Sequence, residues 1–220
     1  MTYTFQFRDV FAAWEVILQG VWMTLYLSAI TMVLGLLIGV LCAAGRVYGA
    51  WPIKALVGTY VEAIRNTPLL VQLFIVFFGL PSVGIRFDAT TAAVITLTIN
   101  LGAYATEIVR AGLEAVPRAQ VEAGYSLGLS GLQVFRHVIL FPSLKMMYPA
   151  LASQFILLML ATSITSQIAV EDLFHVASII QSRTFRDFEV YAVIGVLYLL
   201  LALGFRGLFA VLYQLAFRRR

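Results

Sequence analysis

The sequence has 220 residues, of which 61% are hydrophobic and 12% charged, with a formal net charge of +4. Soluble domains are about 45–50% apolar and about 25% charged, so this composition excludes an ordinary soluble protein and indicates an integral membrane protein. The length fits a single membrane domain over residues 1–220 and leaves no room for a separate catalytic domain.

Apolar runs long enough to cross a bilayer recur along the chain. About twenty apolar residues cross the hydrocarbon core as one helix. The sequence therefore predicts an all-α, polytopic fold with five transmembrane helices. Their expected bounds are residues 20–44, 56–80, 89–110, 146–170 and 190–217, with a polar loop at 114–142.

Basic residues divide unequally between the two sides that these spans imply. Nine lie on one side, including Arg218, Arg219 and Arg220, and four on the other, including Arg8 and Arg86. Cytoplasmic loops carry the excess of Lys and Arg, so we expect the 114–142 loop and the C-terminus in the cytoplasm and the N-terminus outside. The terminal arginines are interpreted as an anchor to anionic membrane lipid and not as a nucleic-acid contact.

The polar loop Glu114–Pro142 reads EAVPRAQVEAGYSLGLSGLQVFRHVILFP. Pro117 suits the first turn of a helix over 118–127. Gly128 is expected to end that helix, and Ser130 to cap a second one over 131–140. Two interpretations stay open from this pattern: a surface helix pair packed on the membrane domain, or a docking element for a soluble partner.

Charged and polar residues within the second and third expected spans predict a transport pathway, because such residues in a membrane helix usually face a protein interior or an aqueous path. Glu62 and Arg65 lie three residues apart and either pair with each other or face the pathway. Pro68 would free backbone carbonyls to line it. Glu107 either binds a substrate ammonium or pairs with Arg110. The further residues of this group are Asn66, Thr67, Gln72, Asn100 and Tyr104.

A polar cluster marks the fourth span. Small polar residues either line a pathway or join helices at a dimer seam, and both interpretations remain. The cluster consists of Gln154, Thr162, Ser163, Thr165, Ser166 and Gln167.

Enzymatic alternatives are weak in this sequence. The only lysines, Lys54 and Lys145, are not part of the GxxxxGK[ST] loop that an ATPase needs, so another chain must hydrolyse any ATP. Ser130, in Gly-Leu-Ser-Gly, and His175 could form an intramembrane serine protease pair, but the motif is short. An ATPase-independent channel or secondary transporter is the other alternative. Two distant histidines suggest no metal site.

Several stretches together resemble one family. Gln120, Glu122, Ala123, Gly128 and Arg136 are similar to the EAA loop of ATP-binding-cassette importer permeases. EAIRNTPLLVQLFIVFFGLP at 62–81 and GAYATEIVRA at 102–111 resemble the second and third spans of polar amino-acid permeases of the histidine, glutamine and glutamate type. The likeness covers about residues 15–217. Departures are Ala119 for a usual Gly, Gly124 for a second Ala, and Pro142 displaced by one.

The resemblance implies a type I importer permease fold in a bacterial-type inner membrane. It implies that the loop forms a coupling helix on a cytoplasmic ATPase dimer, which binds ATP and Mg, while this chain binds no cofactor. It also implies a second permease subunit, identical or sibling, and an extracytoplasmic amino-acid-binding protein. The expected ATPase-coupling residues are Gln120, Glu122, Ala123, Gly124, Gly128 and Arg136.

Overall fold

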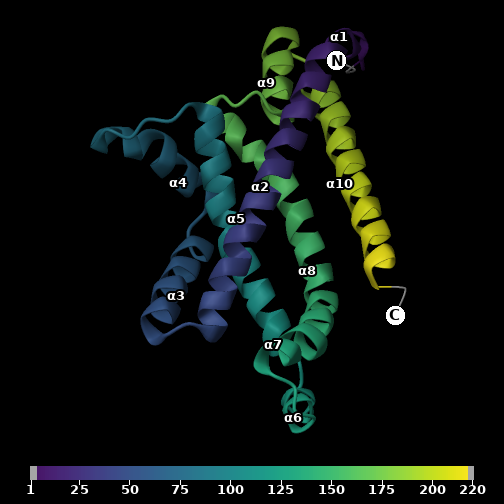
Figure 1. Cartoon of the computed structure of the whole chain (residues 1–220). Coiled ribbons are helices and arrows are strands. Elements are labelled where there is room, and N and C mark those ends of the chain that lie inside the picture. The colour runs from purple at the N-terminus through teal and green to yellow at the C-terminus, as the bar shows by residue number, and fades with distance from the viewer. Residues whose placement is uncertain (1–3, 218–220) are drawn as a thin grey trace. The chain divides into compact units, whose positions relative to one another are not determined.

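A computed structural model describes residues 4–217, and the three terminal arginines of the orientation argument lie outside the described residues. The described chain is helical, as Figure 1 shows, and the all-α expectation is confirmed. In chain order the elements are α1 (Arg8–Ala12), α2 (Trp14–Tyr48), α3 (Trp51–Arg65), α4 (Leu69–Phe74), η1 (Ile75–Gly79), η2 (Leu80–Val83), α5 (Ala89–Glu114), α6 (Arg118–Ser126), α7 (Gly131–Val134), η3 (Phe135–Ile139), α8 (Leu140–Ala161), η4 (Thr162–Ile168), α9 (Leu173–Thr184) and α10 (Asp187–Phe217).

Four described helices are long and apolar enough to cross a membrane: Trp14–Tyr48, Ala89–Glu114, Gly131–Ile168 and Asp187–Phe217. The helices Trp51–Arg65 and Leu69–Val83, which are bent relative to each other, make a fifth span when the two are counted as one broken span. Three of these helices, Trp14–Tyr48, Gly131–Ile168 and Asp187–Phe217, begin before the apolar runs from which they were predicted, and Gly131–Ile168 ends before the expected residue 170.

The expected second span, 56–80, is not one regular helix. Its first helix ends at Arg65, and the next begins at Leu69 with Pro68 as its N-cap. Proline has no backbone N–H and disfavours helical geometry in the preceding residue. The series of helical backbone hydrogen bonds therefore ends before Pro68. The backbone N–H of Gln72 then donates to the Pro68 carbonyl at 3.2 Å, which starts the new helix.

The chain divides into two compact units. Within the described residues, unit 1 contains residues 4–32, 68–97 and 155–208, and unit 2 contains 33–67, 98–154 and 209–217. One division falls between α3 and α4, and the other four fall inside α2, α5, α8 and α10, so each of these four long helices contributes one part to each unit.

Unit 1 has a core in which α9 packs against α1, α2 and α10. Val10, Ile17, Leu173, Val176 and Val190 are among its buried residues. The sequence analysis did not predict α9, because this helix is short and its apolar residues alternate with polar ones. A second cluster in unit 1 brings α2 and α4 together with the start of α5 and the end of η4.

Unit 2 contains a close approach of α2 to α5. A Cβ at Gly39 would lie 2.4 Å from the Cβ of Ala105, so any larger residue would push the helices apart. Tyr60 of α3 donates its hydroxyl to the carbonyl of Ile99 at 2.6 Å. These contacts pack both α2 and α3 against the middle of α5.

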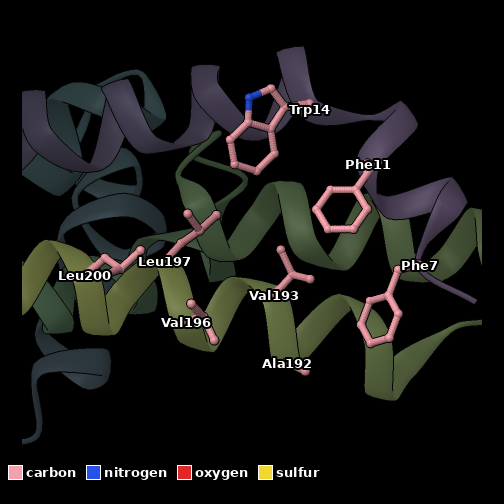
Figure 2. Close-up of a pocket in the computed structure, with 8 residues that line it drawn as sticks. All are labelled: Phe7, Phe11, Trp14, Ala192, Val193, Val196, Leu197 and Leu200. Carbon is pink, nitrogen blue, oxygen red and sulfur yellow. The ribbon is translucent and has the colours of Figure 1, made fainter. Parts of the chain in front are cut away.

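An apolar groove of about 450 Å³ lies in unit 1. Figure 2 shows Phe7, Phe11 and Trp14 on one side and α10 on the other. The α10 residues that line it are Ala192, Val193, Val196, Leu197 and Leu200. An apolar lining of this kind suits the hydrocarbon surroundings of a membrane helix.

Candidate coupling loop and transport pathway

The polar loop folds as two short helices joined at Gly128. The first is α6, which begins directly after Pro117 and ends at Ser126. Its C-terminus is a Schellman motif: the N–H of Leu129 donates to the carbonyl of Gly124 at 3.2 Å, and that of Gly128 to the carbonyl of Tyr125 at 2.9 Å. Gly128 has a φ of 80°, a left-handed conformation that glycine adopts without steric cost.

The second helix of the loop starts at Ser130, as predicted. Ser130 and Gln133 form a capping box, in which the Ser130 N–H donates to Gln133 Oε1 at 2.8 Å. The helix then runs from α7 through the π-helical turn η3 into α8 without a break. The loop is therefore continuous with the fourth long helix, and Ser130 has the role of a cap.

Gly124 is buried, unlike the other expected coupling residues. A Cβ at this position would lie 3.2 Å from Cγ2 of Val134 and 3.4 Å from Cγ2 of Val138. The small residue thus allows α6 to pack on the second helix of the loop. Its role as an ATPase-coupling residue stays a prediction.

The remaining expected coupling residues lie on the surface of the loop: Gln120, Glu122, Ala123, Gly128 and Arg136 are all exposed. Sequence reasoning missed two apolar residues beside them. Leu127 is 82% exposed and Leu132 is 77% exposed. Two exposed leucines beside the exposed polar residues give the loop surface an apolar part next to the turn at Gly128. Their proximity to the turn at Gly128 was the signal that could have identified them.

At the end of α3, Glu62 and Arg65 do not pair with each other. Glu62 accepts hydrogen bonds from the Asn66 side chain through both its backbone carbonyl, at 2.8 Å, and Oε2, at 3.0 Å. Arg65 instead lies over the ring of Tyr104, with 5.3 Å between its Cζ and the ring centroid. Thr67 donates its hydroxyl to the carbonyl of Ala63 at 2.7 Å.

Glu107 is the centre of an ion-pair network in unit 2. Arg110 Nη2 lies 2.7 Å from Glu107 Oε2, and Arg110 Nη1 lies 2.6 Å from Glu114 Oε2. Arg46 Nη1 lies 3.6 Å from Glu107 Oε1. Of the two alternatives for Glu107, the geometry shows the pairing with Arg110, and it adds Arg46 from α2 as a second partner.

A cavity of about 430 Å³ opens beside this network. Its lining includes Arg65 of α3, Glu107 and Arg110 of α5, and Met146 and Met147 of α8. The cavity therefore brings together charged residues that lie more than forty positions apart in the sequence. It lies wholly within unit 2.

Several other expected pathway residues are not among those that line this cavity. Asn100 and Gln154 are half-buried in unit 2, whereas Gln72 is buried in unit 1. In η4 the hydroxyls of Thr162, Ser163 and Ser166 donate to carbonyls three residues earlier, at 2.7, 2.8 and 2.7 Å. Local hydrogen bonds of this kind satisfy the hydroxyls inside a membrane helix.

A buried carboxyl group in unit 1 was not identified from the sequence. Asp172 caps α9, and its Oδ1 accepts from the backbone N–H of His175 at 2.9 Å. Tyr198 donates its hydroxyl to Asp172 Oδ2 at 3.3 Å. Burial raises the pKa of Asp172 to about 6, against the lowering effect of these hydrogen bonds.

The fold and the loop define a membrane-spanning transport subunit. Residues 35–218 match the family described as "Binding-protein-dependent transport system inner membrane component", and the chain belongs to this family. Among solved structures, an amino acid ABC transporter crystallised with histidines is similar with a TM-score of 0.90 and 37% identity, covering 96% of this chain and 99% of that one.

Curated relatives agree with this assignment. The chain is 35% identical to the glutamine transport system permease protein GlnP of Escherichia coli (strain K12) over 201 residues, 90% of this chain and 92% of GlnP. It is 38% identical to the L-cystine transport system permease protein TcyB of Bacillus subtilis (strain 168) over 170 residues, 77% of this chain and 73% of TcyB. The comparisons give no support to the channel, secondary-transporter or protease alternatives.

Proposed function

We propose that this chain is the permease subunit of an ATP-binding-cassette importer that takes up a polar amino acid. Membership of a binding-protein-dependent transport family supports the transport role. The amino-acid cargo is supported by the glutamine and cystine permeases among the relatives and by the solved amino acid transporter. The chain forms the membrane pathway and catalyses no reaction itself.

The loop from α6 to η3 docks on a cytoplasmic ATPase. The observation that carries this proposal is the rigid turn at Gly128, which presents exposed Leu127 and Leu132 on either side. The Schellman motif and the capping box fix both helices that meet there. Exposed Gln120, Glu122 and Arg136 supply polar contacts around this apolar centre, and the small side chain of exposed Ala123 allows the partner to approach closely.

ATP hydrolysis by the partner ATPase supplies the energy for transport. The two lysines lie outside any phosphate-binding loop, so ATP and Mg bind to an ATPase dimer, and this chain requires no cofactor. Closure of that dimer moves the docked loop as a rigid body. Because α7, η3 and α8 form one continuous helical path, the movement passes directly into a membrane span.

A second permease subunit, identical or sibling, completes the pathway. An extracytoplasmic amino-acid-binding protein delivers the amino acid to it. Each unit offers polar residues to a pathway of alternating access: unit 2 those at the end of α3 and along α5, and unit 1 those of η4. Charge distribution supports an orientation with the loop and the C-terminus in the cytoplasm and the N-terminus outside. Exposed apolar side chains along α2 and α10 contact membrane lipid.

Uptake by the complete assembly tests this function. Vesicles containing the permease, its ATPase and its binding protein should accumulate labelled glutamine, glutamate, arginine or histidine only when ATP is supplied. Accumulation without the ATPase would favour the channel or secondary transporter. Absence of uptake for every polar amino acid would contradict the assigned cargo.

A further inference from the structure

The last part of the fourth long helix has 3-10 geometry. This segment, η4, covers seven residues, Thr162–Ile168, whereas 3-10 runs longer than about 3–4 residues are uncommon. It ends at Ala169, whose φ of 60° is left-handed. That conformation brings the Cβ of any residue other than glycine too close to the following carbonyl oxygen. The segment therefore combines an uncommon geometry with a strained residue at its end.

The hydroxyl groups of η4 are bonded in a way that either helical geometry permits. Four of them donate to the carbonyl three residues earlier, at 2.7 or 2.8 Å: those of Thr162, Ser163, Thr165 and Ser166. In the α-helices α2 and α5, by contrast, the hydroxyls of Ser28 and Thr96 donate to the carbonyl four residues earlier, at 2.7 and 2.8 Å. Each η4 hydroxyl can thus exchange one carbonyl for the next when the backbone changes from 3-10 to α geometry, and the number of hydrogen bonds stays the same.

The chain that follows η4 is fixed to two other helices of unit 1. The N–H of Leu173 donates to Thr24 Oγ1 of α2 at 3.1 Å, and Tyr198 of α10 donates to Asp172 Oδ2 at 3.3 Å. A Cβ at Gly20 of α2 would lie 2.9 Å from the Cα of Leu173, so α2 and α9 are in close contact. Because the start of α9 is held in this way, a change in the length of η4 displaces the end of α8 that precedes it.

The size of such a change follows from helix geometry. A 3-10 helix rises about 2.0 Å per residue and an α-helix about 1.5 Å, so each residue that converts shortens the segment by about 0.5 Å. Conversion of about four to seven residues therefore moves the end of α8 by about 2–4 Å along its axis. A narrow void beside Ile164 and Thr165, also lined by Leu73 and Leu97, leaves the side chains of η4 room to adjust.

We propose that η4 is a hinge of the transport cycle, which takes up axial movement of α8 by exchanging 3-10 for α geometry while α9 stays fixed to α2 and α10. Ala169 is the residue that biases this exchange. It is left-handed in the 3-10 form and takes the ordinary right-handed conformation in the α form. The proposal rests on the proposed function, because the movement begins at the loop that closure of the ATPase displaces.

Distances between spin labels in the complete assembly, measured by double electron–electron resonance, test the hinge. One label is placed before η4, at Leu157→Cys in α8, and the other after it, at Ser182→Cys in α9, both in unit 1. The background carries Cys42→Ser, which removes the only native cysteine. Labelled permease is diluted with unlabelled permease, so that each assembly carries one labelled copy. A control pair, Ser182→Cys with Val196→Cys in α10, does not span η4.

The distances are compared without nucleotide and with a non-hydrolysable ATP analogue. The pair that spans η4 should differ between the two states by about 2–4 Å, and the control pair should not change. Ala169→Gly removes the strain and should shift the populations about 5- to 30-fold toward the distance of the 3-10 form. Ala169→Val should shift them the other way, since a β-branched residue is a clear outlier in the left-handed region; Ala169 is exposed, so the larger side chain has room.

Phe185 provides a matched control for the backbone effect. It is left-handed like Ala169, with a φ of 54°, but it ends α9 and lies outside η4. Phe185→Gly should therefore leave both distances and their populations unchanged. An equal population shift in Phe185→Gly and Ala169→Gly would overturn the assignment of the hinge to η4.

An unchanged distance across η4 between the two nucleotide states would overturn the proposal, and so would unchanged populations in Ala169→Gly. A change of the same size in the control pair would place the movement in α9 and also overturn it. A nucleotide-dependent change across η4 in an assembly that takes up no amino acid would refute the proposed cargo and support the hinge.

Discussion

The backbone N–H of Leu129 donates to the carbonyl of Gly124 at 3.2 Å, and this bond closes α6 in the position where Gly124 packs against Val134. The carbonyl of Gly124 thus takes part in the C-terminal cap of α6, and the absence of a side chain at Gly124 lets the second helix of the loop pack closely. In the proposed function, this small core beneath the loop surface keeps Leu127 and Leu132 in a fixed geometry. A rigid loop can transmit a movement that a flexible one would absorb.

The packing beneath the loop predicts a size limit at Gly124. Gly124→Ala requires Val134 to move by a few tenths of an ångström and should leave coupled uptake close to the wild-type rate. Gly124→Leu would force α6 away from α7 and should cost about 1–3 kcal/mol of stability, with loss of coupling. Thermal unfolding in detergent and uptake in vesicles measure the two effects. Wild-type uptake by Gly124→Leu would contradict the packing role.

The network around Glu107 predicts an asymmetry between two glutamates that share Arg110. Glu107→Gln removes the carboxylate that faces both Arg46 and Arg110, so it should cost about 1–3 kcal/mol and weaken uptake without preventing assembly. Glu114→Gln removes the more exposed partner of Arg110 and should cost less than about 1 kcal/mol. Equal effects of both substitutions on the unfolding midpoint would refute the central position of Glu107.

Strain at Phe185 predicts a stabilising substitution. This residue has a φ of 54° and is 82% exposed, so its ring contributes little burial while its Cβ disfavours the left-handed backbone. Phe185→Asn should be neutral or stabilising by up to about 1 kcal/mol, since asparagine tolerates that conformation. Phe188→Asn, at an exposed position within α10, should give no such gain. A lower unfolding midpoint for Phe185→Asn would show that the ring makes a needed contact.

Burial of Asp172 predicts a pH-dependent stability. Its pKa is raised from 3.8 in the unfolded reference to about 6 in the folded protein, so folding favours the protonated form. The stabilising contribution is complete below pH of about 4 and is lost as the pH rises through about 6. Asp172→Asn keeps an acceptor for the His175 N–H and should flatten this part of the profile. An unchanged slope of the unfolding midpoint between pH 4 and 6 would assign it to another group.

The sequence was enough to predict the features that depend on neighbouring residues along the chain, such as apolar helices, helix caps and turns. Hydropathy and length were enough to identify the membrane-capable helices, and Gly128 and Ser130 were enough to place the turn and the second helix of the loop. Features that depend on long-range packing were not predictable. Gly124 could not be assigned to the loop interior without Val134, and the exposure of Leu127 and Leu132 depends on how α6 packs.

The candidate pathway shows the same limit. Spacing alone left open whether Glu62 and Arg65 pair with each other or face the pathway, and the contacts join Glu62 to Asn66 and Arg65 to Tyr104. The i,i+3 distance along a helix permits a pair without requiring one, and a ring from α5 provides the competing contact. Arg46 was likewise outside the expected pathway, because only the approach of α2 to α5 brings it to Glu107.

The central claim is that the loop transmits ATP hydrolysis to transport, and substrate-stimulated ATPase activity in reconstituted vesicles tests it most directly. A variant carrying Glu122→Ala and Gly128→Ala should insert and assemble normally, hydrolyse ATP at the basal rate, and lose both the stimulation by loaded binding protein and the uptake. Stimulation and uptake at wild-type levels in this variant would contradict the claim.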